Sequence, residues 1–581
     1  MRAMTSTADE RDDPRAAYRL QQLRRHLVCR PATAAASELG GPLAAAWCKA
    51  ADNTSVQDAS KVVSAEEAAA LIPDGVWLTP AGFVGTSCPE ALLNAVRRQY
   101  EATGHPRGLG LIYAASAGNS KGRGLDQLAV EGLVDRLIYG WTGTAPGFLK
   151  LVRENKVQAY NLPLGVVSHM IRDVAAKRAG PVTHVGLGTF VDPREKGGKL
   201  NSVTTRDIVH VLNLGGRELL WYQAPDRISV ALLRGSTADL DGNVSFEHEA
   251  LFTDQLNQAL AAHNGGGLVI VQVHQGGDRG TLHPKDLHLP GAIVDRVVVA
   301  PPELHWQSFR DPHYDGSLSG EIRTPLHSIL PLPLDERRII AHRAMLEIDQ
   351  PNCIVNLGVG MPEGVAVMVA THGAAQNPYA ASVTLSTEAG AFGGIPGGGL
   401  RFGSSHNPAC LVPTASMIDF YNGSGVDVAC LGLAEVDPTG SVNVSNFGNG
   451  RMPGCGGFID ISQTAKKVLF VGTFTSSGLK VAVEAGRLAI RQEGSLQKFR
   501  RAVHEKTFAG ASANGRTVLY ITERAVFRLA QQQPGAGASA CVLELVEVAP
   551  GIDIERDILP HMEFRPLVRS VRQMPPQIFI A

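Results

Sequence analysis

The sequence predicts an α/β protein in which two similar, open and mostly parallel α/β domains lie in tandem on one chain. At 581 residues, the chain is several times the usual size for a single hydrophobic core. Short β-branched runs alternate with amphipathic helical stretches from Lys61 to about Ala300, and again from about Leu334 to about Gln573. The motifs of the second region repeat those of the first, which indicates a duplication.

These patterns divide the chain into four parts. We expect residues 1–60, rich in Ala, Arg and Ser and without periodic apolar faces, to be a disordered extension. A transit peptide is the alternative, although Asp9 and Glu10 are acidic where such peptides avoid acid. An N-terminal domain is expected over residues 61–300, a proline-rich linker over 301–333, and a C-terminal domain over 334–581.

The duplication is visible in two pairs of segments. "GVWLTPAGFVGTSCPEALLNAV" from Gly75 and "CIVNLGVGMPEGVAVMVA" from Cys353 each run from a strand through a glycine turn into a Pro-Glu helix start. Proline suits the first helical position and Glu favours the positive helix end. In the second pair, Asp239 and Gly242 correspond to Asp437 and Gly440. Two such domains predict a cleft between them.

Near the C-terminus, "TVLYITERAVFRLAQQQPGAGASACVLELVEVAPG" predicts strands around a Gly/Pro loop.

Composition excludes several classes of function. The 54 Lys and Arg residues nearly balance 55 Asp and Glu residues, and no basic tract is present, so a nucleic-acid partner is not expected. The apolar runs stop well short of the roughly eighteen residues that a membrane-spanning helix needs. The eight cysteines show no C-x-x-C spacing, which disfavours zinc and a disulfide framework and favours the reducing cytoplasm.

The glycine turns lack the common nucleotide-binding and hydrolase signatures. They do not give the G-x-G-x-x-G spacing of a dinucleotide site, and no G-x-x-x-x-G-K-[ST] loop for ATP is present. A G-x-S-x-G nucleophile elbow is also absent. We therefore expect no permanently bound cofactor and no metal.

Glu388 is the strongest candidate for chemistry. It stands alone in "SVTLSTEAGAFGGIPGGGLRFGSSHNP", just after a predicted strand and before a glycine turn, where open α/β sheets carry functional groups. A glutamate is charged at neutral pH and can act as a nucleophile without a neighbouring His. Attack on an acyl carbon needs oxyanion donors, which the glycine turns "AGFVG" and "GCGGF" offer as backbone amides. A solvated loop residue or a helix cap is the alternative for Glu388.

Three other reactive residues have simpler interpretations. Cys88 and Cys455 are expected to pack as small side chains, because the sequence suggests no base for either. His406, in "GSSHNP", is expected to be a turn residue.

The chain from Lys61 to about Ile554 resembles family I CoA-transferases, in particular the single-chain acetate and propionate branch. "IVNLGVGMPEGVA", "STEAGAFGGIPGGGLRFG", "IDFYNGSGVDVACLGLAEVDPTGSVNVSNFG" and "GCGGFIDISQTAKKVLFVGTFT" carry the resemblance in the second half. The first half carries "AGFVGTSCPEAL", "GLIYAASAGNSKGRGLDQLA", "NLPLGVVSHMIRDVAAKRAGPVTHVGLGTFVDPREKGGKLN" and "AHNGGGLVIVQV".

The resemblance implies a ping-pong transfer of CoA between short-chain acyl-CoA and a free carboxylic acid. Glu388 would attack the thioester and then hold CoA as a glutamyl thioester, with CoA as substrate and covalent intermediate. The resemblance implies oxyanion amides at Val84 and Gly456. It also implies a CoA path formed by Gly358, Gly360, Gly399, Leu400, Gly403, Gly454, Gly457 and Phe458.

The chain departs from the family pattern at Ser386-Thr387, at Ala391-Phe392 and at Asn446, and two of these departures bear on ligand binding. Phe392 is bulkier than the usual residue and is expected to reshape the acyl pocket, so the donor and acceptor acids stay open. Asn446 stands where a Lys is expected, which puts a contact with a CoA phosphate in doubt.

Two alternative functions on the same fold stay open for this chain: an acyl-CoA hydrolase that admits water to Glu388, and a non-catalytic metabolite sensor.

The expected partners are small acyl-CoA and carboxylate molecules, with neither nucleic acid nor membrane. The family implies a homodimer or homotetramer. A cytoplasmic location is expected, or a mitochondrial one if residues 1–60 form a transit peptide.

Overall fold

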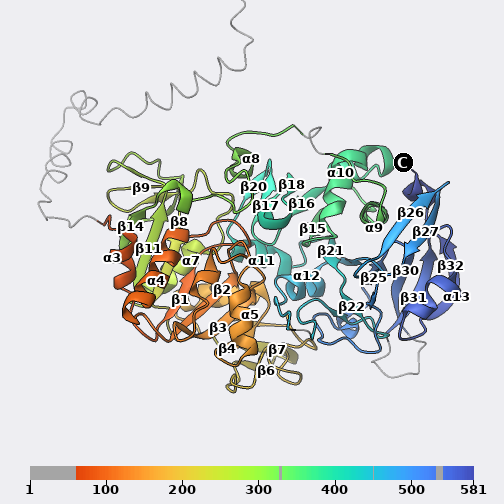
Figure 1. Ribbon diagram of the computed structural model, residues 1–581, viewed down its shortest axis with the longest axis horizontal. Coiled ribbons are helices and arrows are strands. Elements are labelled where there is room, and N and C mark those ends of the chain that lie inside the picture. The colour runs from red at the N-terminus through yellow and green to blue at the C-terminus, as the bar shows by residue number, and fades with distance from the viewer. Residues whose placement is uncertain (1–60, 326–329, 449, 532–540, 581) are drawn as a thin grey trace, which may run out of the picture. The chain divides into compact units, whose positions relative to one another are not determined.

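The computed structural model describes residues 61–325, 330–448, 450–531 and 541–580 (Figure 1). The predicted extension, residues 1–60, lies outside the described residues, and so does the predicted Gly/Pro loop near the C-terminus, residues 532–540. Within the described part of the chain, no helix is long and apolar enough to cross a membrane.

The first half is built on a seven-stranded sheet in which every neighbouring pair of strands is parallel. β2 is buried along its whole length, as expected for a strand covered on both faces. In sheet order the strands are β14 (Arg296–Val299), β11 (Leu268–Val273), β8 (Val230–Arg234), β1 (Trp77–Pro80), β2 (Leu109–Ala115), β3 (Val134–Trp141) and β4 (Gln158–Asn161).

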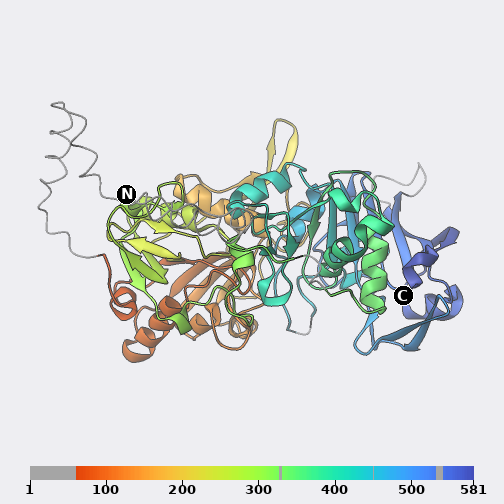
Figure 2. The ribbon, with the colours of Figure 1, turned by 90° about the horizontal axis from the view of Figure 1, so that it is seen from above.

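Within residues 61–300, five α-helices accompany this sheet (Figure 2). They are α3 (Ala65–Ala70), α4 (Glu90–Thr103), α5 (Pro146–Arg153), α6 (Leu164–Ala175) and α7 (Gln255–Asn264). Smaller antiparallel strands, including β6 (Val209–Leu214) and β7 (Arg217–Tyr222), extend from this half. The core is formed by apolar strand residues such as Leu111 and Leu137, which pack against helix residues such as Leu92.

The second half carries a ten-stranded sheet with a parallel centre and antiparallel additions on both sides. Its parallel centre is β16 (Thr384–Ser386), β15 (Ile354–Leu357), β21 (Val428–Gly432), β24 (Lys467–Val471) and β29 (Thr517–Ile521). β17 (Ala391–Phe392) and β20 (Cys410–Leu411) lie beyond β16; β30 (Ala525–Gln531), β31 (Cys541–Val548) and β32 (Leu567–Gln573) lie beyond β29. The predicted strands near the C-terminus are therefore present.

Two apolar clusters pack against this second sheet. One contains residues of α9 (Glu336–Met345) and α10 (Glu363–Gln376), and the other contains residues of α11 (Thr414–Asn422) and α12 (Phe458–Thr464). The prediction of two mainly parallel α/β domains is confirmed.

The duplication is repeated in local structure. Asp239 Oδ1 accepts the amides of Asp241 and Asn243, and Asp437 Oδ1 accepts those of Thr439 and Ser441. The two helix starts also correspond, but with an offset from the sequence prediction. Pro89 and Pro362 occupy the N-cap positions, and the adjoining Glu90 and Glu363 are the first helical residues.

Candidate active site

Glu388 lies just beyond the carboxyl end of β16, in a tight turn that brings the chain back as β17. The Thr387 amide donates to the Ala391 carbonyl, and the Thr387 hydroxyl donates to the Gly403 carbonyl at 2.6 Å. These bonds fix the backbone on either side of the carboxylate. The Glu388 residue is only 7% exposed, so it is not the solvated loop residue that the alternative interpretation requires.

The Glu388 carboxylate is buried with little compensation. Its Oε2 atom has no hydrogen-bond partner among the described residues. Burial, together with the nearby Asp460, raises the pKa of Glu388 to about 7. Loss of water destabilises the charged form, and a second acidic group adds to this effect. A carboxyl group held in this state is a candidate functional group, because titratable groups with shifted pKa values gather at active sites.

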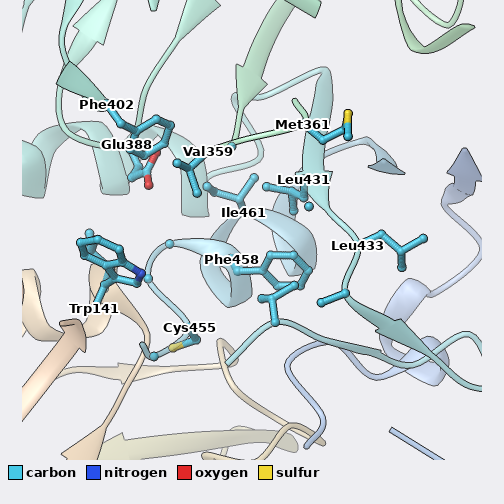
Figure 3. A pocket seen from close by; sticks show the side chains of 18 of the residues that line it. Trp141, Val359, Met361, Glu388, Phe402, Leu431, Leu433, Cys455, Phe458 and Ile461 are labelled. Carbon is cyan, nitrogen blue, oxygen red and sulfur yellow. The ribbon is translucent and has the colours of Figure 1, made fainter. Parts of the chain in front are cut away.

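Glu388 opens into a cavity of about 340 Å³ (Figure 3). The walls are mostly apolar and come from both halves of the chain. The first half contributes Phe83, Val84, Ala115, Trp141 and Leu164. The second half contributes Gly358, Val359, Met361, Phe402, Leu431, Gly432, Leu433, Ala434, Val444, Phe447, Gly454, Cys455, Gly456, Gly457, Phe458, Ile461, Val471, Gly472 and Lys498, in addition to Glu388.

The cavity follows the carboxyl ends of parallel strands in both sheets. Ala115 and Trp141 are the last residues of β2 and β3, while Gly358, Gly432 and Gly472 stand at the ends of β15, β21 and β24. This is the edge at which open α/β sheets bind ligands.

Val84 has an unusual backbone conformation at this edge. Its φ angle is 55°, in the left-handed region that a β-branched residue rarely adopts. The "AGFVG" turn is tightened by a reciprocal pair of hydrogen bonds, each of 3.0 Å, between Phe83 and Thr86. Strain of this kind collects at functional sites.

The "GCGGF" loop is attached to the first half by hydrogen bonds of its own backbone. The Cys455 amide donates to Asn161 Oδ1 at 3.0 Å, and the Gly456 carbonyl accepts the Leu164 amide at 2.9 Å. Gly457 lies directly against the catalytic candidate, since a Cβ added there would come within 3.2 Å of Glu388 Cγ. The Gly456 amide itself donates to the Gly140 carbonyl at 3.0 Å, so this bond must open before Gly456 can serve an oxyanion.

The residues predicted to form the CoA path fall into two groups. Gly358, Gly454, Gly457 and Phe458 line the cavity with Glu388, Val84 and Gly456. Gly360, Gly399, Leu400 and Gly403 are not among the residues that line it.

For Leu400 and Gly403, the reason is that the "GGGLRFG" segment packs against the "AGFVG" turn. A Cβ on Gly85 would lie 2.2 Å from the Leu400 carbonyl oxygen, and one on Gly403 would lie 2.6 Å from the Phe83 ring. The Phe402 side chain of the same segment lines the cavity, while Gly360 and Gly399 are exposed.

The two departures from the family pattern also lie away from the cavity. Phe392 packs edge-on against Phe420, with ring centroids 5.3 Å apart, and does not line the pocket. Phe402 is the phenylalanine of this segment that faces the cavity. Asn446 also does not line the cavity, and its carbonyl accepts from Asn443 Nδ2 at 2.7 Å.

The three reactive residues with simpler interpretations have structural contacts. Burial raises the pKa of both the Cys88 and Cys455 thiols, and Cys455 Sγ donates to the Leu162 carbonyl. His406 Nδ1 lies 2.8 Å from the Ser317 hydroxyl, which attaches its turn to the segment between the two sheets. Among the described residues, no group of three or more His, Cys, Asp or Glu is arranged to hold a metal ion.

Sequence reasoning missed Asp460, Trp141 and Lys498. Asp460 is fully buried in the first turn of α12, where its Oδ2 accepts the Gly165 amide at 3.0 Å, and burial raises its pKa to about 7. Trp141 and Lys498 carry no motif. Gly432 and Gly472 were the available sequence signal, because they mark the carboxyl ends of β21 and β24, which belong to the same run of parallel strands as β16.

The arrangement combines a buried carboxylate with an unpartnered Oε2 atom, a mostly apolar cavity and bare backbone on two sides. A carboxylate in such a site attacks an electrophilic carbonyl carbon readily, because little solvation has to be removed.

Comparison with known proteins agrees with this chemistry. Residues 62–300 match the family model described as Coenzyme A transferase. The chain is 42% identical to a caffeate CoA-transferase of Acetobacterium woodii over 518 residues, which are 88% of this chain and 95% of that protein. It is 39% identical to the acetate CoA-transferase YdiF of Escherichia coli K12 over 526 residues, 89% of this chain and 95% of that protein.

A solved structure shares the fold of most of the chain. The acyl-CoA transferase YdiF of E. coli O157:H7, described as a thioester complex with CoA, superposes with a TM-score of 0.82 at 38% identity. The match covers 90% of this chain and 96% of that chain.

Proposed function

Because the chain belongs to the coenzyme A transferase family and is a CoA-transferase, we propose that Glu388 holds the transferred CoA as a covalent thioester. The observation that carries the proposal is the buried Glu388 carboxylate, whose Oε2 atom has no partner among the described residues, at the wall of a mostly apolar cavity. The thioester complex recorded for the related acyl-CoA transferase supports it.

The reaction has two halves. The ionised Glu388 carboxylate attacks the carbonyl carbon of the acyl-CoA. The C–S bond then breaks, which releases the CoA thiolate and forms a mixed anhydride between Glu388 and the acyl group. The thiolate then attacks the Glu388 carbonyl carbon and releases the first acid as a carboxylate. An incoming carboxylate reverses both steps, so the energy of the thioester is retained throughout.

The two glycine turns would stabilise the oxyanion of each attack. We assign this role to the amides of Val84 and Gly456, and contact with CoA to Gly358, Gly454, Gly457 and Phe458. An oxyanion donor contributes roughly 2.7–4 kcal/mol to acyl transfer. Leu400 and Gly403 pack against the "AGFVG" turn and are assigned a supporting position, while the exposed Gly360 and Gly399 stay candidates for contact with CoA outside the cavity.

The substrates proposed are short-chain acids, with acetate and propionate first. The relatives named for acetate and for caffeate support this class of reaction but differ in the acid, so donor and acceptor are to be determined by assay. A cytoplasmic homodimer or homotetramer is part of the same proposal. Hydrolysis would require water at the glutamyl thioester, which a mostly apolar cavity disfavours.

The experiment traps the intermediate. The protein is incubated with propionyl-CoA without acceptor acid and treated with borohydride, and the peptide containing Glu388 is examined by mass spectrometry. We expect that side chain to be reduced to an alcohol only after acyl-CoA treatment, and Glu388→Gln to lose CoA transfer by more than about 10³-fold.

Glu131→Gln is the control, because Glu131 is exposed and its carboxylate pairs with Lys156 at the surface. An unmodified Glu388 peptide in the presence of transfer activity would contradict the covalent route. Release of free CoA with no acceptor present would instead favour hydrolysis.

A further inference from the structure

Lys498 is the second charged residue of the cavity. Among the described residues that line it, Glu388 and Lys498 alone carry groups that are charged at neutral pH under ordinary conditions. Lys498 lies between Gln497, the last residue of β28 (Leu496–Gln497), and Phe499, which is fully buried. The Phe499 ring stacks on Phe474 at 4.5 Å, which anchors the backbone from which Lys498 extends.

The Lys498 ammonium is incompletely satisfied. Its Nζ donates to the Leu433 carbonyl and to the Thr473 hydroxyl, both at 3.1 Å. An ammonium carries three donors, so one remains for a ligand. Lys498 forms no ion pair with any described residue.

The nearest acidic group does not neutralise Lys498. Glu523 acts on it electrostatically, but the Glu523 carboxylate accepts from Arg524 Nε at 2.7 Å and from the Phe474 amide at 2.8 Å. Burial lowers the pKa of Lys498 to about 8, as expected for a cation that has lost water without gaining an anion. An oxygen atom of an incoming ligand would accept a hydrogen bond from the ammonium and so replace the solvation that burial removes.

The sheet fixes how far Lys498 lies from Glu388. Glu388 follows β16, and Lys498 Nζ lies beside Gly472 at the end of β24. β16, β15, β21 and β24 are consecutive parallel strands, so the two groups are three strand spacings apart, about 14 Å. In Figure 3, Val359, Leu431 and Ile461 lie between Glu388 and Leu433, whose carbonyl binds Lys498.

This spacing matches the arm of CoA. From the sulfur atom to the first phosphate, the arm is a chain of about a dozen bonds, which spans roughly 15 Å when extended. Its methylene and methyl groups suit the apolar cavity wall, its two amides can meet the bare backbone of the wall, and its far end carries a carbonyl, a hydroxyl and phosphate oxygens. A short acyl group bound at Glu388 would end far from Lys498.

We propose that Lys498 binds an oxygen at the far end of the CoA arm and thereby sets the position of the thioester against Glu388. The proposal rests on the proposed function, since it takes Glu388 as the reacting group. Lys498 is a positioning residue in this scheme: it touches the substrate but not the reacting atoms. Binding energy from the distant arm then accelerates the reaction at the carbonyl carbon.

The test pairs a shortened side chain with a shortened substrate. Propionyl-CoA is compared with the thioester of propionate and N-acetylcysteamine, which keeps the reacting end but lacks the far part of the arm. For Lys498→Met, we expect kcat/KM to fall by about 10–100-fold with propionyl-CoA, the effect of one charged hydrogen bond. With the truncated thioester, the two proteins should react at equal rates within about twofold, as a thermodynamic cycle requires.

Two further variants serve as controls. Lys467→Met is matched, because Lys467 lies at the opposite end of β24 and its Nζ binds Asp349 and the Glu347 carbonyl. It should not change the ratio between the two substrates. Lys498→Arg keeps the positive charge and should restore part of the rate with propionyl-CoA.

Binding of desulfo-CoA, which has no thiol and cannot react, separates this proposal from that for Glu388. Calorimetry should show binding weakened by about 10–100-fold in Lys498→Met and unchanged in Glu388→Gln. Three results would overturn the role of Lys498. The first is an equal loss of kcat/KM with both thioesters, the second is unchanged binding of desulfo-CoA, and the third is a loss of rate that depends only on the acyl chain. Failure to trap a Glu388 thioester would overturn the proposed function while leaving the binding result intact.

Discussion

The surroundings of Glu388 destabilise the charged form of its carboxyl group, so the stability of the folded protein depends on pH. Its pKa rises from 4.5 to about 7 on folding, so the folded protein binds a proton that the unfolded chain releases between these values. The stability that this group contributes is therefore complete below pH 4.5 and is lost as pH rises to about 7.

Replacing Glu388 by Gln should consequently stabilise the protein at high pH. At pH 8, we expect the free energy of unfolding of Glu388→Gln to exceed that of the parent by about 2–3 kcal/mol. The gain should diminish as pH falls and disappear near pH 4.5. Denaturant unfolding of both proteins at a series of pH values measures this. A difference that stays constant across the series would show that the ionisation of Glu388 is not its cause.

At the level of single residues, the sequence alone identified the candidate carboxylate but not the buried charged residues near it. Glu388 was recognisable because it follows a short strand and precedes glycines. Lys498 was not, because a buried Phe499 and strands far apart in the sequence bring it to the cavity. Asp460 appeared as an ordinary residue of a short helix, and only the packing of α12 against Gly165 shows that it is buried.

At the level of elements, the cavity wall depends on contact between glycine-rich turns. The turn at Val84 and the segment at Leu400 approach so closely that Gly85 has no room for a side chain. Sequence analysis correctly predicted the strand, turn and helix order around these glycines. It could not tell a glycine that lines a cavity from one that packs behind it, because both occur in the same motif.

Gly85→Ala tests this contact. A Cβ at Gly85 would meet the Leu400 carbonyl oxygen at 2.2 Å, so the backbone of one turn must move. We expect a loss of about 1–3 kcal/mol in the free energy of unfolding and reduced CoA transfer. Thermal unfolding and an activity assay measure the two effects.

Gly316→Ala provides the comparison, since its Cβ would reach Ile322 only at an ordinary contact of 3.4 Å. It should unfold at a temperature no lower than the parent protein. If Gly85→Ala behaved in the same way, the close approach of the two turns would not matter for the cavity.

At the level of the whole molecule, the active cavity is completed only when the two halves are in contact. Hydrogen bonds join Asn161 to Cys455, Leu164 to Gly456 and Gly165 to Asp460. The alternation of strands and helices predicted both sheets and their common origin. It could not predict these hydrogen bonds, because the way in which two domains dock leaves no periodic pattern in a sequence.

A chain divided between Thr324 and Leu330 should therefore reassemble. We expect the two fragments, produced together, to co-purify through a tag on one of them and to transfer CoA, because every cross-half bond named above is retained. Asn161→Ala in the divided protein should weaken co-purification, since Asn161 Oδ1 accepts the Cys455 amide.

Asn201→Ala is the matched control, because the Asn201 amide group donates to Val152 and Val157 within the first half. Fragments that fold but purify separately would show that the covalent connection, and not the contact surface, holds the halves together.

The backbone at Val84 sets a limit on how far this protein can be made heat-resistant. A β-branched residue at a φ of 55° carries a conformational cost of order 1–3 kcal/mol. Glycine or asparagine would relieve it, so selection for survival at high temperature favours exchanging this valine. Selection for turnover opposes the exchange, because the same valine forms part of the wall beside Glu388. Stability and catalytic rate are therefore expected to compete at this position.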